Sequence, residues 1–196
     1  MSTIMSTTIT VPLSTLRAVA LFAATKDVRY FISGVFIDPA GALVATNGHR
    51  LITHELGEPS PLPPTIVPMD AIKAALKAGR NSAMIRIAAD QLVVHTKSGN
   101  ITILYTPIDG TYVNWRRIAE SAKNAEAARP TEGPICFHWP YLADCQTAFD
   151  LVVEGKPCKD VTTAVGVRLT PTGTTAAIAT CSAAPGTVCY VMPRRR

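Results

Sequence analysis

The sequence predicts an α+β fold built from three similar units, each a strand, a helix and then several short strands. Three features carry this prediction. Stretches rich in β-formers reach a proline near positions 12, 68 and 140; an amphipathic helical pattern accompanies each proline; and short strand-like stretches separated by turn residues follow each helix. The copies are ~50–60 residues long, a period typical of repeated supersecondary units. Since one unit cannot cover its own helix and sheet edge, two units are expected to pair into a domain.

The repeated segments are 8–16, 65–72 and 135–142. Helices are predicted over 13–25, 69–78 and 140–152, because apolar residues recur there at helical spacing. Strands are predicted over 30–37, 43–46, 83–87, 91–95, 101–105, 165–169, 175–179 and 188–192, with hairpin turns at 38–41 and 97–100. We expect residues 1–122 to form a complete two-unit domain, 123–134 a linker and 135–196 a half domain.

Composition excludes several classes of protein. Apolar residues make up 47% and charged residues 17% of 196, which is typical of a globular chain. The longest apolar run, 18–24, is far too short for a membrane span, and no lysine or arginine precedes Arg17 as a secretory signal would require. The net charge is +5, of which residues 194–196 contribute three. We therefore expect a cytoplasmic protein without a membrane partner.

Neither a metal site nor an enzyme is expected. The five cysteines all lie in the last third, and none is in a CxxC pair, which favours reduced thiols over a disulfide framework. Cys136 and His138 alternate as on an ordinary strand rather than forming a zinc pair. The sequence has no GxxxxGK, GxGxxG, HExxH or GxSxG motif, so no cofactor is predicted.

Four motifs in order resemble the bacterial DNA polymerase III β sliding clamp family. They are DVRYFISGVFI at 27–37, VATNGHRL at 44–51, DGTYVNWRRI at 109–118 and YVMPR at 190–194. The first 122 residues resemble the middle domain of a clamp, and 132–196 resemble the second half of its last domain. The resemblance therefore implies a DNA-clamp fold with one full domain and a half domain, three units where a clamp chain has six.

The resemblance implies a hydrophobic cleft that docks short peptides of DNA polymerase and clamp loader. Carried over residue by residue, the cleft comprises Ile32, Thr46, Gly48, His49, Arg50, Leu51, Arg117, Ile118, His138, Tyr141, Thr175, Met192, Pro193 and Arg194. Apolar members would line the pocket, with methionine as an adaptable wall. Arg50 and Arg117 are expected to form a polar rim. The simpler interpretation is that His49 and Arg50 only satisfy a turn and a carboxylate.

This chain departs from the family pattern at several positions in or beside the cleft motifs. Asn47 replaces an aspartate, Val113 a proline, His138 an asparagine and Arg194 an apolar residue. The cleft is therefore expected to accept a different peptide or to bind more weakly.

The second implied function is sequence-independent contact with duplex DNA. Lys73, Lys77 and Arg80 share one helical face, and the inner surface of clamps is lined by such helices. The candidate DNA-contacting residues are Arg17, Lys26, Arg29, Tyr30, Phe31, Lys73, Lys77 and Arg80. An ordinary solvated basic face is the alternative. Asp144 and Asp150 on the third helix would repel phosphate if they faced DNA.

The unit count predicts a homo-oligomer. Four chains of three units would close a ring of twelve, so a tetramer is favoured and a dimer is the alternative; two half domains would pair across a two-fold axis. We therefore expect a DNA sliding clamp, a processivity factor in DNA replication. The alternative is a clamp-like interaction protein or decoy that binds replication proteins without encircling DNA. A shortened clamp suggests a viral or mobile-element genome.

Overall fold

The computed structural model describes residues 7–79, 83–127, 135–158 and 164–194. The first unit comprises β1 (Ile9–Pro12), α1 (Leu13–Ala20), the 3-10 turn η1 (Tyr30–Ile32), β2 (Gly34–Asp38), β3 (Ala42–Thr46) and β4 (Arg50–Glu55). The second comprises β5 (Thr65–Pro68), α2 (Met69–Ala78), β6 (Met84–Ile87), β7 (Gln91–Thr96) and β8 (Gly99–Leu104). After α3 (Trp115–Ala127), the third unit comprises α4 (Trp139–Glu154), β9 (Arg168–Thr170), β10 (Ala177–Thr180) and β11 (Thr187–Val191). The predicted α+β fold of three units is confirmed.

The first two units exchange their leading strands. β1 pairs with β6 of the second unit, and β5 pairs with β2 of the first, both antiparallel. Pro12 and Pro68 are the residues that end these strands and cap α1 and α2, since proline suits a helix start and has no N–H to leave unpaired. This exchange of strands interlocks the first two units.

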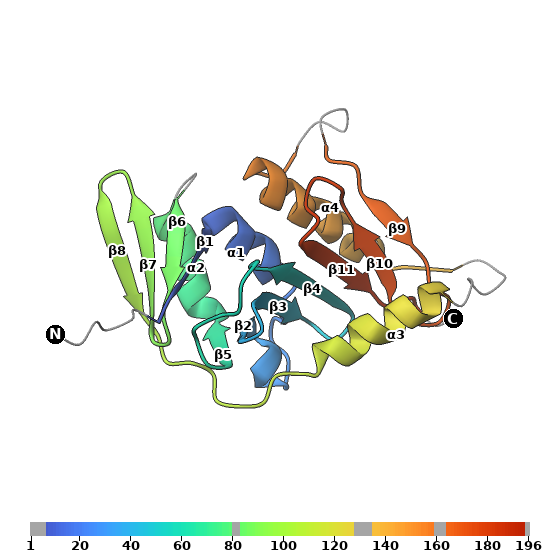
Figure 1. Cartoon of the computed structure of the whole chain (residues 1–196), viewed down its shortest axis with the longest axis horizontal. Coiled ribbons are helices and arrows are strands. Elements are labelled where there is room, and N and C mark those ends of the chain that lie inside the picture. Colours follow the sequence, from blue (N-terminus) through green and yellow to red (C-terminus); the bar gives the residue numbers. More distant parts are fainter. Residues whose placement is uncertain (1–6, 80–82, 128–134, 159–163, 195–196) are drawn as a thin grey trace.

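The third unit extends the sheet of the first unit. β11 pairs antiparallel with β4, which joins the strands into one seven-stranded sheet in the order β5-β2-β3-β4-β11-β10-β9. The other sheet has the order β1-β6-β7-β8. In Figure 1, β8 lies at one end of the molecule and β9 at the other.

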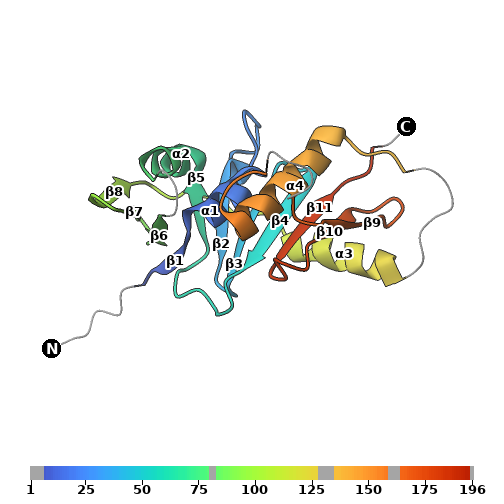
Figure 2. The same ribbon diagram turned by 90° about the horizontal axis from the view of Figure 1, so that it is seen from above.

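Helices cover both faces of the long sheet. α1, α2 and α4 contribute to one core cluster, in which α1 packs against both α2 and α4. α3 packs on the opposite face with a second cluster, where Ala119 and Ala122 meet Ala176, Ile178 and Tyr190. Figure 2 shows α4 and α3 on opposite sides of the strands of the third unit.

The sequence analysis missed two elements, the strand β4 and the helix α3. α3 runs through the boundary expected at 122/123, while 128–134 of the expected linker lie outside the described residues. Buried Asp38 anchors the start of α3, because one carboxylate oxygen accepts a hydrogen bond from Trp115 Nε1 (2.9 Å) and forms an ion pair with Arg116 (2.6 Å). The other oxygen accepts the Ala40 N–H (2.9 Å) within the turn between β2 and β3. Burial by itself would raise the pKa of Asp38, but these contacts outweigh burial and lower it.

Two further predicted elements differ from the structure. α1 ends at Ala20 rather than at 25, because the chain tightens into i−3 hydrogen bonds from Phe22 to Val19 and from Ala23 to Ala20. The 135–138 stretch, predicted as the strand before the third helix, belongs to no β-ladder of the described chain. Pro140 lies in the first turn of α4, where the pattern placed it.

Candidate binding cleft and basic helix face

A pocket of about 270 Å³ opens where the first unit, α3 and the third unit meet. Its lining comprises Arg29, Ile32, Thr46, Gly48, His49, Arg50, Leu51, Val113, Ile118, Ala176, Tyr190 and Met192. Leu51 of β4 lies directly opposite Tyr190 of β11, so the strand pairing between units builds the pocket floor. Their neighbours Ile52 and Cys189 form the next cross-strand pair and belong to the core on the helix side.

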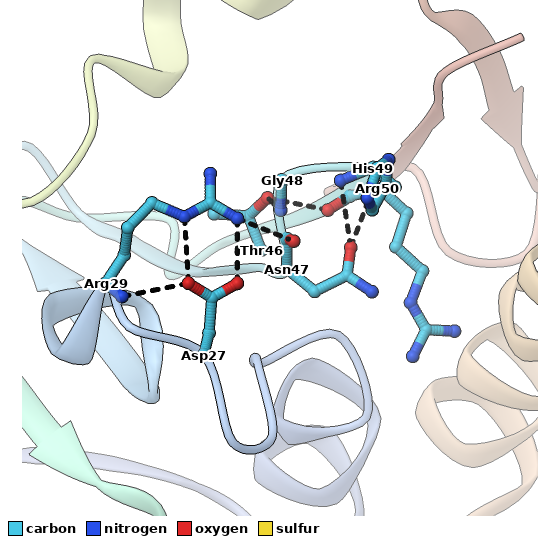
Figure 3. A network of polar contacts seen from close by, with 7 residues as sticks. All are labelled: Asp27, Arg29, Thr46, Asn47, Gly48, His49 and Arg50. Atoms are coloured by element: carbon cyan, nitrogen blue, oxygen red, sulfur yellow. Dashed lines mark hydrogen bonds and ion pairs between the residues drawn. The ribbon is translucent and has the colours of Figure 1, made fainter.

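One wall of the pocket is the turn between β3 and β4. Thr46 Oγ1 accepts a hydrogen bond from the Gly48 N–H (3.0 Å) and donates one to the Arg50 carbonyl (2.7 Å). Asn47 Oδ1 accepts from the N–H groups of His49 (3.0 Å) and Arg50 (3.1 Å). Figure 3 shows these contacts closing the turn. Because an aspartate oxygen accepts the same two bonds, the departure at Asn47 leaves this turn geometry possible.

Arg29 lies at the rim of the pocket and is held there by Asp27. Asp27 accepts hydrogen bonds from its N–H (2.9 Å), Nε (3.0 Å) and terminal nitrogen (2.8 Å), and these bonds hold the pKa of Asp27 at about 2. The guanidinium also contacts the Asn47 carbonyl (3.4 Å) (Figure 3). Gly48 has φ +87°, and a Cβ there would lie 2.7 Å from Arg29, so glycine permits this close approach.

Arg50 is not the exposed rim residue that the sequence analysis expected. Its side chain is 10% exposed, donates to the Leu21 carbonyl (2.7 Å) and forms an ion pair with Asp144 of α4. The guanidinium lies over the rings of Phe22 (4.9 Å) and Tyr141 (5.0 Å). The physical reason is strand alternation: because Leu51 faces the pocket, Arg50 points to the helix side and bridges α1 to α4.

Aromatic rings and the C-terminal segment form the side of the cleft beside the third unit. The ring of Tyr141 stacks on His49 at 6.1 Å and lies 4.9 Å from His138. The Met192 N–H donates to the His49 carbonyl (2.8 Å), and the Arg194 N–H donates to the Cys136 carbonyl (2.7 Å). These bonds hold exposed Met192 over the pocket.

The predicted cleft residues fall into two groups. The structure brings Ile32, Thr46, Gly48, His49, Arg50, Leu51, Ile118 and Met192 to the pocket. His138, Tyr141, Pro193 and Arg194 lie beside it, whereas Arg117 is exposed on α3 and Thr175 bonds to Thr172. The sequence analysis did not include Arg29, Val113, Ala176 and Tyr190 in the cleft; only the pairing of β4 with β11 could have indicated Tyr190.

The predicted DNA-contacting residues are more scattered. Lys73 and Lys77 are exposed on α2, Arg17 is half-buried on α1, and Arg80 lies outside the described residues. Lys26 is exposed with φ +59°. Tyr30 is exposed and meets Phe31 edge to face at 5.8 Å.

The acidic residues of α4 have structural partners. Asp150 is 2% exposed and accepts hydrogen bonds from Gln146 (3.1 Å) and from the N–H groups of Cys158 (3.3 Å) and Val165 (3.3 Å). Asp144 pairs with Arg50. The expectation that both would repel phosphate is therefore wrong for Asp150, which is buried, and weakened for Asp144, whose charge is balanced.

Within the described residues, no group of three or more His, Cys, Asp or Glu side chains could hold a metal ion. Cys136, Cys145, Cys181 and Cys189 are not in disulfides. None of the helices in this part of the chain has the length and hydropathy needed to cross a bilayer.

Comparison with solved structures identifies the fold. The DNA polymerase III subunit β of Pseudomonas aeruginosa matches with a TM-score of 0.62 and 18% identity over 96% of this chain and 66% of that chain. The sliding clamps of Caulobacter crescentus (TM-score 0.62, 17% identity, 100% and 68%) and Bacillus subtilis (0.62, 15%, 100% and 66%) match similarly. No family model matches the sequence, and no curated protein does.

These likenesses show that the chain has the fold of bacterial β sliding clamps. It spans about two thirds of the length of the clamps it matches. The resemblance carried by the four sequence motifs is thereby confirmed at the level of the fold.

Proposed function

We propose that this chain is a subunit of a DNA sliding clamp, a non-enzymatic ring that encircles duplex DNA and docks peptides of replication proteins. The observation that carries the proposal is that α1, α2 and α4 share one core cluster with both sheets, α1 packing between α2 and α4, so that the helices together form one face of the molecule. Such a face can approach a phosphate backbone while the sheets form the outer wall. A ring holds DNA by topology, so a weakly basic lining suffices.

The lining charges support contact with DNA. Lys73 and Lys77 project from α2 one turn apart, and Arg17 adds a charge on α1. The structural roles of Asp144 and Asp150 remove the main argument against DNA on this face. Contacts of this kind position a protein on the backbone without reading sequence.

The pocket supports peptide docking. Ile32, Leu51 and Tyr190 give it a buried apolar floor, and Met192 forms an adaptable wall. Arg29, held in place by Asp27, supplies fixed N–H donors at the rim for a peptide carbonyl. About 270 Å³ holds one or two side chains, which suits a short linear motif rather than a folded partner.

The ring requires several copies. Three units per chain and a twelve-unit ring give four chains, and β8 and β9 are the strands at the two ends of the molecule where further copies would join. We therefore favour a tetramer, with a dimer as the alternative. DNA polymerase and clamp-loader peptides are the proposed partners of the pocket.

The DNA proposal is tested by retention on closed circular DNA against linear DNA of the same length. A ring stays on the circle and slides off the linear molecule; the double variant Lys73→Glu/Lys77→Glu should be retained less, while Lys97→Glu, an exposed reversal in the β7–β8 turn, should behave as wild type. Equal loss from both DNAs, with peptide binding intact, would favour the clamp-like decoy.

The peptide proposal is tested by titrating a fluorescent clamp-binding peptide. Met192→Ala should weaken binding about 10-fold, the loss of one buried apolar contact. Met84→Ala is the matched control, because Met84 (42% exposed) and Met192 (41%) are equally exposed. Met84 lies in β6 of the four-stranded sheet, whereas Met192 follows β11 of the seven-stranded sheet. Saturable binding that both variants leave unchanged would place the site elsewhere.

A further inference from the structure

The first two units show how one unit caps another. The N–H of Leu13, the first residue of α1, donates to the Ala83 carbonyl next to β6 (2.9 Å), and that of Met69 on α2 donates to the Ser33 carbonyl next to β2 (3.3 Å). Leu13 is 4% exposed because its side chain lies against Gly79 of the second unit. In each unit, therefore, the first residue of the helix bonds to the other unit, and the strand before it pairs with a strand of the other unit.

The third unit has these same parts without a covering unit. Trp139, the first residue of α4, is 75% exposed, although tryptophan is a residue that folded chains largely bury. In the stretch before it, half-buried Ile135 and Phe137 alternate with exposed Cys136 and His138, the period of a strand that packs on one face. Yet this stretch belongs to no β-ladder of the described residues.

The sheet of the third unit is also open where a partner strand would pair. β9 is the last strand of the seven-stranded sheet and holds the place that β2 holds in the first unit, where β5 of the second unit adds to its edge. Within β9, Leu169 is half-buried and contributes to the core from this open edge. A strand that adds to β9 would extend the same core.

We propose that the third unit completes a domain with the third unit of a second copy of this chain, about a two-fold axis. Each copy would add its 135–138 stretch to β9 of the other, as β5 adds to β2 and β1 adds to β6. Trp139 of each copy would then enter the core of the other, as Leu13 enters the second unit. A second copy fits because one unit carries both halves of the contact, the free strand and the free edge, as a two-fold interface requires.

Mass measurements on the full-length protein test this interface. Wild type should form at least dimers at about 10 μM, within the range where an interface of standard size holds. Trp139→Glu should halve the mass or more, because it places a charge in the shared core. Val28→Glu, at an exposed apolar position that lies in neither end strand, is the control and should keep the wild-type mass. Monomeric wild type, or Trp139→Glu with wild-type mass, would overturn the proposal.

Tryptophan fluorescence gives a second readout that does not depend on shape. The chain has two tryptophans, so Trp115→Phe leaves only Trp139. Its emission should be blue-shifted in the assembled protein and should move to the red on dilution, in step with the loss of mass. An emission maximum typical of exposed tryptophan at every concentration would contradict burial at the interface.

This pairing rests on the proposed ring only for its context, and the experiments can refute one proposal without the other. If Trp139→Glu halves the mass and wild type is not retained on circular DNA, the pairing of third units is supported and the ring is refuted. If Trp139→Glu keeps the wild-type mass and lowers only peptide affinity, Trp139 belongs to the cleft and the pairing is refuted.

Discussion

Replacing Arg50 tests whether this residue supports the fold or lines the peptide cleft. Arg50→Met keeps an unbranched apolar stem but removes the guanidinium that bridges α1 and α4. A hydrogen bond from a charged donor, as to the Leu21 carbonyl, contributes about 1.5–3 kcal/mol. The two ring contacts add about 0.5–1 kcal/mol each. The ion pair adds under about 1 kcal/mol, because Asp144 is 34% exposed.

These contributions overlap, and methionine recovers part of the packing, so we expect Arg50→Met to lower the free energy of unfolding by about 2–4 kcal/mol. Urea denaturation followed by circular dichroism measures the loss. Amide hydrogen exchange should show faster exchange in β11 than in wild type and little change in β7, because Arg50 holds the third unit to the first. The control Asp144→Asn removes only the partly exposed charge and should cost under about 1 kcal/mol.

The opposite pattern would refute this account of Arg50. If Arg50→Met changed the free energy of unfolding by less than about 0.5 kcal/mol while peptide affinity fell, the side chain would serve the cleft rim, and the bridge to α4 would contribute nothing measurable.

Three further predictions concern the turn, α3 and the seam between the units. Gly48→Ala should destabilise the chain by about 1–2 kcal/mol and weaken peptide binding, since φ is +87° there and the new methyl group would displace Arg29. Thermal melts measure the stability and a peptide titration the affinity. An unchanged melting temperature and an unchanged affinity would contradict the close approach of Arg29 to Gly48. Asp38→Ala should lower the free energy of unfolding by about 1–3 kcal/mol in urea denaturation, because the start of α3 loses its acceptor. A loss below about 0.5 kcal/mol, the size expected for a neutral surface substitution, would argue against this anchor. His54 contacts Thr187 between β4 and β11, and burial lowers its pKa. Its contribution to the free energy of unfolding is therefore complete above the unfolded-state pKa near 6.5 and declines as the pH falls below that value. His54→Gln should flatten this part of the stability profile between pH 7 and 5, and an unchanged slope would exclude His54 as its source.

Local patterns predicted the turn, and the resemblance to the clamp family named eight of the residues that line the pocket. The turn at 46–51 is closed by side chains two or three residues away, so its geometry follows from a short stretch of sequence. The prolines at 12 and 68 likewise set the strand-to-helix boundaries that the structure has.

Long-range pairing is where the sequence was insufficient. That Tyr190 lies opposite Leu51 depends on the register between β4 and β11, which are more than a hundred residues apart in the chain. α3 was missed because its first residues belong to the motif at 109–118 and its apolar face is small. That face consists of Ile118, Ala119 and Ala122. That face is stable where it is because of the strands of the third unit, not because of propensity.

The charges on α4 show why composition misjudged the case for DNA. Counting Asp144 and Asp150 gave a helix that should repel phosphate, but a carboxylate that accepts three hydrogen bonds inside the fold contributes little field at the surface. The acid that remains exposed on this helix is Glu154, with Lys156 two residues further on. The surface that would meet DNA is therefore nearly neutral on α4 and positive on α2. If a ring forms, its electrostatic contacts with the DNA backbone should be concentrated at the α2 helices. Reversing the charges of Lys73 and Lys77 should therefore abolish most of the salt dependence of DNA retention.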